Sequence, residues 1–172
     1  MKYIYFLIFM IIFTGCSSKY QNLSTVKTVD IQRYLGTWYE VGRYENSFEK
    51  GCIGASATYT LAKDKSLKVL NRCYDENGQE IASAMGEAYS VDTTNTKLKV
   101  SFFWPFYGDY WIIKLAEDYR YSIVSEPRKK YLWILSRSKE LTSKDRKEIL
   151  YFLREEGFNT ENIFWTKLDK IL

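Results

Sequence analysis

One short segment, Tyr34-Leu35-Gly36-Thr37-Trp38-Tyr39-Glu40-Val41, indicates the architecture of the whole chain. Gly36 stands two residues before Trp38, at the start of a run of alternating residues. A glycine at this place indicates a crowded backbone, and the large ring that follows it is expected to turn inward. We therefore expect a strand to begin here and the later strands to return to the Trp38 ring.

Downstream of Trp38, turn signals separate segments with strand character. The eight segments are expected at about 38–44, 53–62, 67–75, 80–91, 97–104, 110–116, 120–126 and 131–138. The connections at 63–66, 92–96 and 117–118 are short enough for hairpins. This spacing predicts an all-β fold, an eight-stranded up-and-down antiparallel barrel.

Alternation assigns the faces of these strands, because successive side chains point to opposite sides. An eight-stranded barrel can hold one small ligand or be filled by its own side chains, and both outcomes stay open. Small residues at Ala55 and Ala57 would leave room. Trp111 is assigned to the interior. The apolar faces comprise Ala55, Ala57, Tyr59, Leu67, Val69, Asn71, Leu98, Val100, Phe102, Trp111, Ile113, Leu115, Tyr131, Trp133 and Leu135.

Helical signals flank the strands. Residues 30–35 begin with a capping aspartate and predict one helical turn across the bottom of the barrel. Residues 143–156 predict an amphipathic helix, which Thr142 or Ser143 would cap and Gly157 would end. Its apolar side is expected to pack on the outside of the barrel. A short final strand is expected at 162–165.

The composition excludes several classes of function. The chain has 172 residues, with 15 Tyr, 10 Phe and 5 Trp, which suits strands around an apolar pocket. It has no histidine, so Ser-His and Cys-His nucleophiles and imidazole metal sites are excluded. The net charge of +4 is scattered, which argues against nucleic-acid binding. No cofactor is expected.

The N-terminus has the pattern of a secretory signal. Lys2 precedes an apolar run over 3–13 that is too short to span a membrane. Cys16 follows Thr14-Gly15 and resembles the lipobox of bacterial lipoproteins, although Phe13 stands where Leu is usual. The resemblance implies cleavage of residues 1–15 and acylation of Cys16, for instance with palmitate. A plain signal peptide with a chance cysteine is the alternative.

Three motifs resemble those of the lipocalin family, in particular its bacterial outer-membrane lipoproteins. They are Gly36-Thr37-Trp38, Leu115-Ala116-Glu117-Asp118-Tyr119, in which Glu117 replaces the usual Thr, and Leu132 to Arg137. By strand counting, all three lie at one end of the barrel. The likeness runs over nearly all of 30–165. It implies that Arg137 lies across Trp38 as a cation–π pair, so that Gly36, Trp38 and Arg137 close the barrel floor.

The resemblance also implies a domain plan and a location. A lipidated tether over 16–29 would precede a barrel domain over 30–172. Ser17, rather than Asp, follows the lipidated cysteine and implies an outer-membrane location facing the periplasm. A homodimer is left open.

Two cysteines remain after acylation, Cys52 and Cys73. The second and third strands would bring them opposite one another near the mouth, and antiparallel neighbours can meet the Cα separation of about 4.4 to 6.8 Å that a disulfide needs. A disulfide is expected in an oxidising compartment, with two free thiols as the alternative.

The ligand candidates lie inside the barrel. Tyr59, Asn71 and Trp133 match pocket positions of the family, and Phe102, Trp111, Tyr131 and Leu135 extend the set. A buried Asn or Tyr needs a hydrogen-bond partner, which would be the ligand head, another side chain or water.

The mouth is expected near 45–52, 76–79, 104–109 and 127–130. Three aromatics on 104–108 would either fold back or form a lid or membrane-touching tip. Lys50, Arg128 and Lys129 would attract an acidic head or remain solvated.

Three functions follow from these features. The first is non-enzymatic binding, storage or transport of a fatty acid or lysophospholipid in envelope maintenance. The second is a lipid-acting enzyme that uses carboxylates such as Glu40 and Glu87. The third is a structural lipoprotein with a filled barrel. The binding function is preferred, because histidine is absent and both remaining cysteines are expected to be paired.

Overall fold

The computed structural model describes residues 23–64 and 66–171. The predicted signal peptide and Cys16 lie outside the described residues. The elements in chain order are α1 (Ile31–Tyr34), β1 (Gly36–Tyr44), the 3₁₀ turn η1 (Ser47–Glu49), β2 (Gly54–Leu61), β3 (Leu67–Tyr74), β4 (Glu80–Ser90), β5 (Lys97–Phe103), β6 (Phe106–Leu115), β7 (Tyr121–Ser125), β8 (Leu132–Ser136), α2 (Ser143–Glu155), η2 (Thr160–Asn162), β9 (Ile163–Trp165) and α3 (Leu168–Ile171).

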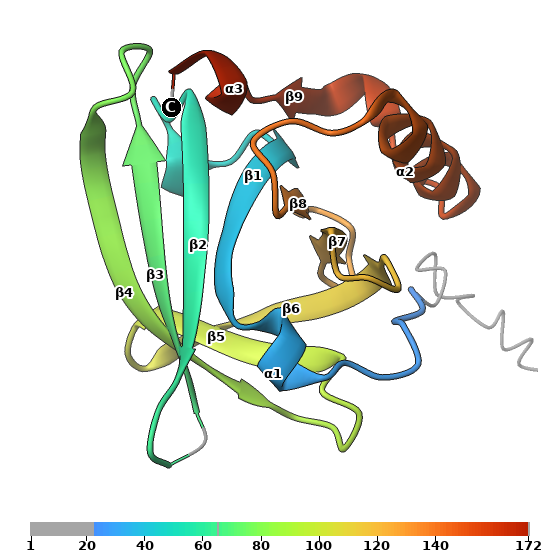
Figure 1. Cartoon of the computed structure of the whole chain (residues 1–172). Coiled ribbons are helices and arrows are strands. Elements are labelled where there is room, and N and C mark those ends of the chain that lie inside the picture. Colours follow the sequence, from blue (N-terminus) through green and yellow to red (C-terminus); the bar gives the residue numbers. More distant parts are fainter. Residues whose placement is uncertain (1–22, 65, 172) are drawn as a thin grey trace, which may run out of the picture.

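Strands β1 to β8 form the closed barrel that the sequence predicts. Each strand pairs antiparallel with the next, and β1 pairs with both β2 and β8, which closes the sheet (Figure 1). The short strand β9 adds to the far end of β1, where Gly42 pairs with Trp165 and Tyr44 with Ile163. The up-and-down topology and the final strand are therefore confirmed.

Helix α2 packs on the outside of the barrel, as expected (Figure 1). The Oγ1 of Thr142 caps it by accepting a bond from the Asp145 amide at 3.1 Å, and Gly157 follows its end with φ +77°. Ile149 and Leu153 of α2 are fully buried in the outer cluster. The strand and loop residues of that cluster are Val41, Ile113, Ala116, Tyr121, Ile123, Leu132, Ile134, Phe158 and Ile163, together with Leu23.

The lower end of the barrel is closed by the residues of the three motifs. Trp38 is fully buried, and the Arg137 guanidinium carbon lies 3.8 Å from the centre of its ring. Arg137 also donates three bonds of 2.8 Å to backbone carbonyls, including that of Thr37. Tyr119 accepts a bond from the Asp30 amide at 2.9 Å. The predicted floor is therefore confirmed.

Gly36 sits at this floor with φ +89°, a conformation that side chains disfavour. A Cβ there would lie 3.5 Å from Arg137 Nη1. The glycine of the first motif thus permits the turn that leads into β1.

Two sequence expectations at β6 are wrong. The strand begins at Phe106 and not at 110, because Phe103 pairs with Phe106 across a turn of Trp104 and Pro105. Residues 104–109 are therefore not a mouth loop. Trp111 does not face the interior.

A bulge between Ile112 and Lys114 explains the second error. It breaks the alternation that assigned Trp111, Ile113 and Leu115 to one face. Trp111 and Ile113 belong to the outer cluster, whereas Ile112 and Leu115 belong to the inner one.

Candidate functional site in the barrel

Small residues of β2 and β4 flank the inner face of β3. Asn71 lies between Ala57 and Ala84 across three strands, and Cys73 lies between Ala55 and Ala82. The residues of β4 that share this inward face are Ala82, Ala84, Gly86 and Ala88. Ala82 and Ala84 are exposed although they face inward, which leaves this wall of the barrel accessible.

Aromatic side chains come from other strands. Phe102 faces the interior over Gly86, where an added Cβ would lie 2.7 Å from Phe102 Cδ1. Gly86 thus allows the ring to lie flat on the wall. Trp133 and Leu135 face inward from β8, as predicted.

The deep end of the interior carries a chain of hydroxyl groups. Tyr59 Oη lies 2.9 Å from Tyr110 Oη, which lies 2.8 Å from Tyr34 Oη, and Tyr34 Oη lies 3.1 Å from Ser122 Oγ. Burial raises the pKa of Tyr34 to about 12 and raises those of Tyr59 and Tyr110 as well. These phenols stay neutral and satisfy one another. Tyr59 therefore has a protein partner for its hydroxyl.

Sequence reasoning missed Tyr110 as an interior residue. Tyr110 stands two residues before Ile112 and therefore shares its face. If a bulge had been allowed for, both residues would have been placed inside the barrel. Lys114, which alternation places on the same face as Tyr110, led to the assignment of that face to the outside.

Asn71 is the polar side chain of the small-residue wall. Its Oδ1 is buried, and among the described residues it has no hydrogen-bond partner. A buried amide oxygen without a partner costs about 1–3 kcal/mol, which a donor from a bound molecule would offset. A ligand-facing role for Asn71 stays a prediction, which this unpartnered oxygen favours.

A charged cluster lies on the inner face near the mouth. Arg43 Nη1 lies 2.6 Å from Glu40 Oε1, and both side chains are buried. Arg43 Nη2 donates to the Cys52 carbonyl at 2.8 Å. Glu49 accepts a bond of 3.1 Å from Trp133 Nε1 and lies 3.8 Å from Arg43 Nε. The cluster joins β1, the β1–β2 loop and β8.

This cluster holds two carboxylates for one guanidinium. Burial raises the pKa of Glu40 well above its usual range, and the nearby Glu49 carboxylate adds to this, while Arg43 opposes it. Within the described part of the chain, Arg43 Nε has no hydrogen-bond acceptor. The mouth therefore offers a donor and a partly screened negative charge to a polar head.

Sequence reasoning missed Arg43 and Glu49. A charge is not expected on the inner face of a barrel, and a register shift between Glu40 and Gly42 puts both Glu40 and Arg43 there. A spacing of three between opposite charges in a strand was the available signal.

A row of rings leads from the cluster to the rim. The Tyr131 and Trp133 rings stack with centroids 5.8 Å apart, and the Phe48 ring lies 5.6 Å from that of Tyr131. Phe48 itself is exposed on the β1–β2 loop. Tyr131 and Trp133 thus share one face, as alternation predicts.

A disulfide joins Cys52 to Cys73, with the Cα atoms 5.2 Å apart. It ties the β1–β2 loop to β3 beside the Arg43 contact. The predicted pairing is confirmed.

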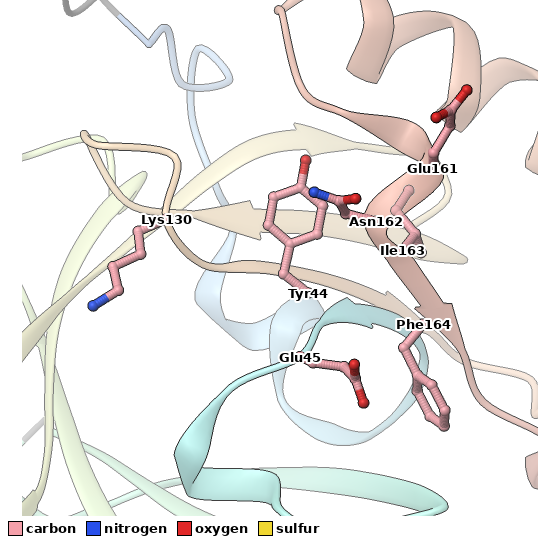
Figure 2. Close-up of a pocket in the computed structure, with 7 residues that line it drawn as sticks. All are labelled: Tyr44, Glu45, Lys130, Glu161, Asn162, Ile163 and Phe164. Atoms are coloured by element: carbon pink, nitrogen blue, oxygen red, sulfur yellow. The ribbon is translucent and has the colours of Figure 1, made fainter.

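Two of the hollows between the described residues open at the rim. The larger has a volume of about 520 Å³ and lies between the end of β1, the β7–β8 loop and β9; Figure 2 shows Lys130 at its left and Glu161 at its right. The smaller, of about 170 Å³, reaches Arg43 and Glu49. Glu45 and Phe164 line both. Neither reaches the deep residues of the interior.

The residues suggested for catalysis do not come together. Glu87 pairs with Lys68 on the outer face of the sheet, whereas Glu40 lies inside with Arg43. Residues 23–64 and 66–171 contain no group of three or more side chains that could hold a metal ion. Across the same ranges, no helix is long and apolar enough to cross a membrane.

Comparisons with known proteins agree with this geometry. Residues 29–168 match the family model of the lipocalin-like domain. The chain is 36% identical to outer membrane lipoprotein Blc of Escherichia coli over 160 residues, which cover 92% of this chain and 90% of that protein. It is 32% identical to temperature-induced lipocalin-1 of Arabidopsis thaliana, over 85% and 83% of the two chains.

A solved structure shows the same fold. Insecticyanin from Manduca sexta superposes with a TM-score of 0.70 at 20% identity, over 86% of this chain and 85% of that one. The motifs at the barrel floor, the closed eight-stranded sheet and the match of the family model lead to one conclusion: this chain belongs to the lipocalin family.

Proposed function

We propose that this protein binds a small amphiphilic lipid, a fatty acid or lysophospholipid, inside the barrel and stores or carries it in the cell envelope. The observation that carries the proposal is the accessible inward face of β4, with small residues opposite aromatic rings. Burial of an acyl chain there would contribute about 0.8 kcal/mol per methylene group. The names of the bacterial relatives support a role in the envelope.

The polar head would remain at the mouth. Arg43 and the smaller hollow offer a donor, and Asn71 offers an acceptor further in. The phenol chain closes the deep end with groups that already have partners. The barrel is therefore apolar along its wall and polar toward the rim, which suits a single-chain amphiphile.

We also infer that Cys16 is the lipidated first residue of the mature protein, after removal of residues 1–15. Residues 16–29 would tether the barrel to the outer membrane, where it would face the periplasm. Mass spectrometry of the N-terminal peptide of the mature protein tests this. An acylated Cys16 supports it, and a free Cys16 thiol or a different cleavage site contradicts it.

The binding function is tested first by native mass spectrometry of the chain from Gln21 onward, purified from its host. A bound amphiphile that is lost on mild delipidation supports the proposal and identifies the ligand class. On adding the ligand back, quenching of Trp133 fluorescence is expected. A barrel that is empty and ignores both fatty acids and lysophospholipids contradicts the proposal.

A matched pair of variants places the ligand inside the barrel. Ala84 faces inward, and its neighbour Met85 faces outward and is exposed. Ala84→Trp should weaken binding about tenfold or more, because an indole would displace at least two methylene groups of the chain. Met85→Trp should leave the affinity unchanged. Equal affinities for the two variants would exclude the barrel interior as the site.

A further inference from the structure

The hairpin that joins β5 and β6 ends in exposed rings. Phe103 is 75% exposed, Trp104 is 79% exposed and Phe106 is 70% exposed. The Phe103 and Phe106 rings stack at 6.3 Å, and Tyr107 contacts Tyr89 on the outer face. Exposed apolar groups of this size usually mark an interaction site.

The end of the hairpin is uncharged, and its nearest charges form an ion pair at its base. Residues 100–108 carry none, and Lys99 pairs with Asp109 at 2.8 Å directly below them. The five residue steps from Lys99 to Trp104 span about 17 Å. A polar base with an uncharged aromatic end is the distribution expected at a membrane surface, where Trp and Tyr gather at the level of the headgroups.

The shape of the hairpin also favours a bilayer over a protein partner. Its turn has two residues, Trp104 and Pro105, with rings on either side. Its exposed rings therefore gather at the end of a two-stranded hairpin. Amphipathic elements bury apolar groups about 5–10 Å deep in a membrane, which this end could do while the ion pair stays in water.

The proposed lipid anchor would limit how far the barrel can lie from a bilayer. The proposed lipidation site Cys16 is seven residues before Leu23, the first described residue, so the intervening chain spans at most about 25 Å. Phe102, next to the exposed rings, faces the barrel interior. The apolar surface of the hairpin is thus continuous with the proposed lipid site.

We propose that the end of the β5–β6 hairpin, Phe103 to Tyr107, inserts into the interface of a lipid bilayer and gives the protein a second membrane contact beside its lipid anchor. This contact goes beyond lipid binding in the barrel, and it uses the anchor proposed above only to bring the membrane near. It would hold the barrel mouth against the surface from which a lipid enters or leaves.

The test uses the full chain as the lipoprotein on vesicles of phosphatidylethanolamine and phosphatidylglycerol. Some vesicles carry lipids brominated near the top of the acyl chains, which quench tryptophan that reaches them. We expect bromine quenching in the wild type, and Trp104→Phe should lower it at least about twofold. Trp165→Phe is the control, because that ring lies against Arg146 of α2. It should change little.

A second measurement separates this proposal from lipid binding in the barrel. A brominated fatty acid without vesicles should quench Trp133, and Trp133→Phe should abolish that signal. If the fatty acid does not quench Trp133 in the wild type while vesicles still quench Trp104, barrel binding is contradicted and the membrane contact is not. If the fatty acid quenches Trp133 but vesicles do not quench Trp104, the membrane contact is overturned and barrel binding is not.

A further outcome identifies a different occupant. If vesicles do not quench Trp104, and Trp104→Phe instead converts a dimer to a monomer in sedimentation, the hairpin is an interface between copies and the bilayer proposal is wrong. The double variant Phe103→Ser with Phe106→Ser repeats both measurements. Because both side chains are exposed, the double variant should fold normally and keep the far-UV circular dichroism spectrum of the wild type.

Discussion

Replacement of Arg43 by methionine should be among the most damaging single changes in the barrel. Methionine keeps most of the length of the side chain but removes the guanidinium that lies 2.6 Å from Glu40 and 2.8 Å from the Cys52 carbonyl. Both members of the pair are buried, so at a pH above its raised pKa Glu40 would carry a buried charge without this partner. The free energy of unfolding should fall by roughly 3–5 kcal/mol.

The stability that Arg43→Met loses should increase as the pH rises. Burial raises the pKa of Glu40 in the folded protein, so the folded state binds more protons than the unfolded one. Its contribution to stability is present below the unfolded pKa of about 4.3 and is lost as the pH rises through the folded value. Removal of Arg43 should raise the pKa of Glu40 in the folded protein further, because Arg43 lowers it. The variant should therefore lose more stability at about pH 8 than at about pH 5.

Urea unfolding followed by circular dichroism at the two pH values measures this. The double variant Glu40→Gln with Arg43→Met should recover much of the loss, since no buried charge remains. Lys99→Met, which breaks a half-exposed pair with Asp109, is the control and should cost about 1 kcal/mol or less. A loss of less than about 1 kcal/mol in Arg43→Met at both pH values, or no recovery in the double variant, would refute the reasoning.

Three further changes probe the frame of the site. Arg137→Ala removes the cation–π contact with Trp38 and three bonds to carbonyls, and should lower the free energy of unfolding by roughly 2–4 kcal/mol in urea titrations. Cys52→Ser with Cys73→Ser opens a link across 21 residues and should cost about 3 kcal/mol; dithiothreitol should destabilise the wild type similarly and leave the double variant unaffected. Gly86→Ala places a Cβ 2.7 Å from the neighbouring ring and 2.8 Å from a backbone carbonyl, and should lower thermal stability by about 1–3 kcal/mol together with lipid affinity, whereas unchanged values would contradict the described packing.

The barrel could be predicted because its strands alternate and its floor carries a motif. Trp38 and Arg137 are 99 residues apart in the chain, and strand counting still placed them at the same end. Alternation also identified the inward faces of β2, β3 and β8, since no bulge interrupts the pairing of β2 with β3 or of β7 with β8. The inward positions of Asn71 and Trp133 were predicted in this way.

The errors share a physical cause. The bulge in β6 reverses the alternation at Trp111, and the register shift in β1 turns Arg43 to the same inward side as Glu40. A bulge depends on how two strands fit one another, so one strand read alone does not reveal it. The two-residue turn at Trp104 was missed because five uncharged residues with a proline resembled a loop.

The pairing of β9 with β1 has a consequence for assembly of the sheet. At its far end β1 leaves β2, and the backbone groups of Gly42 and Tyr44 would face outward as an open strand edge. An unpaired edge is a template for the strands of other molecules. The segment that covers it lies far along the chain from β1. Until β9 pairs with β1, a folding molecule has one unpaired strand edge. A chain truncated before Ile163 should therefore aggregate.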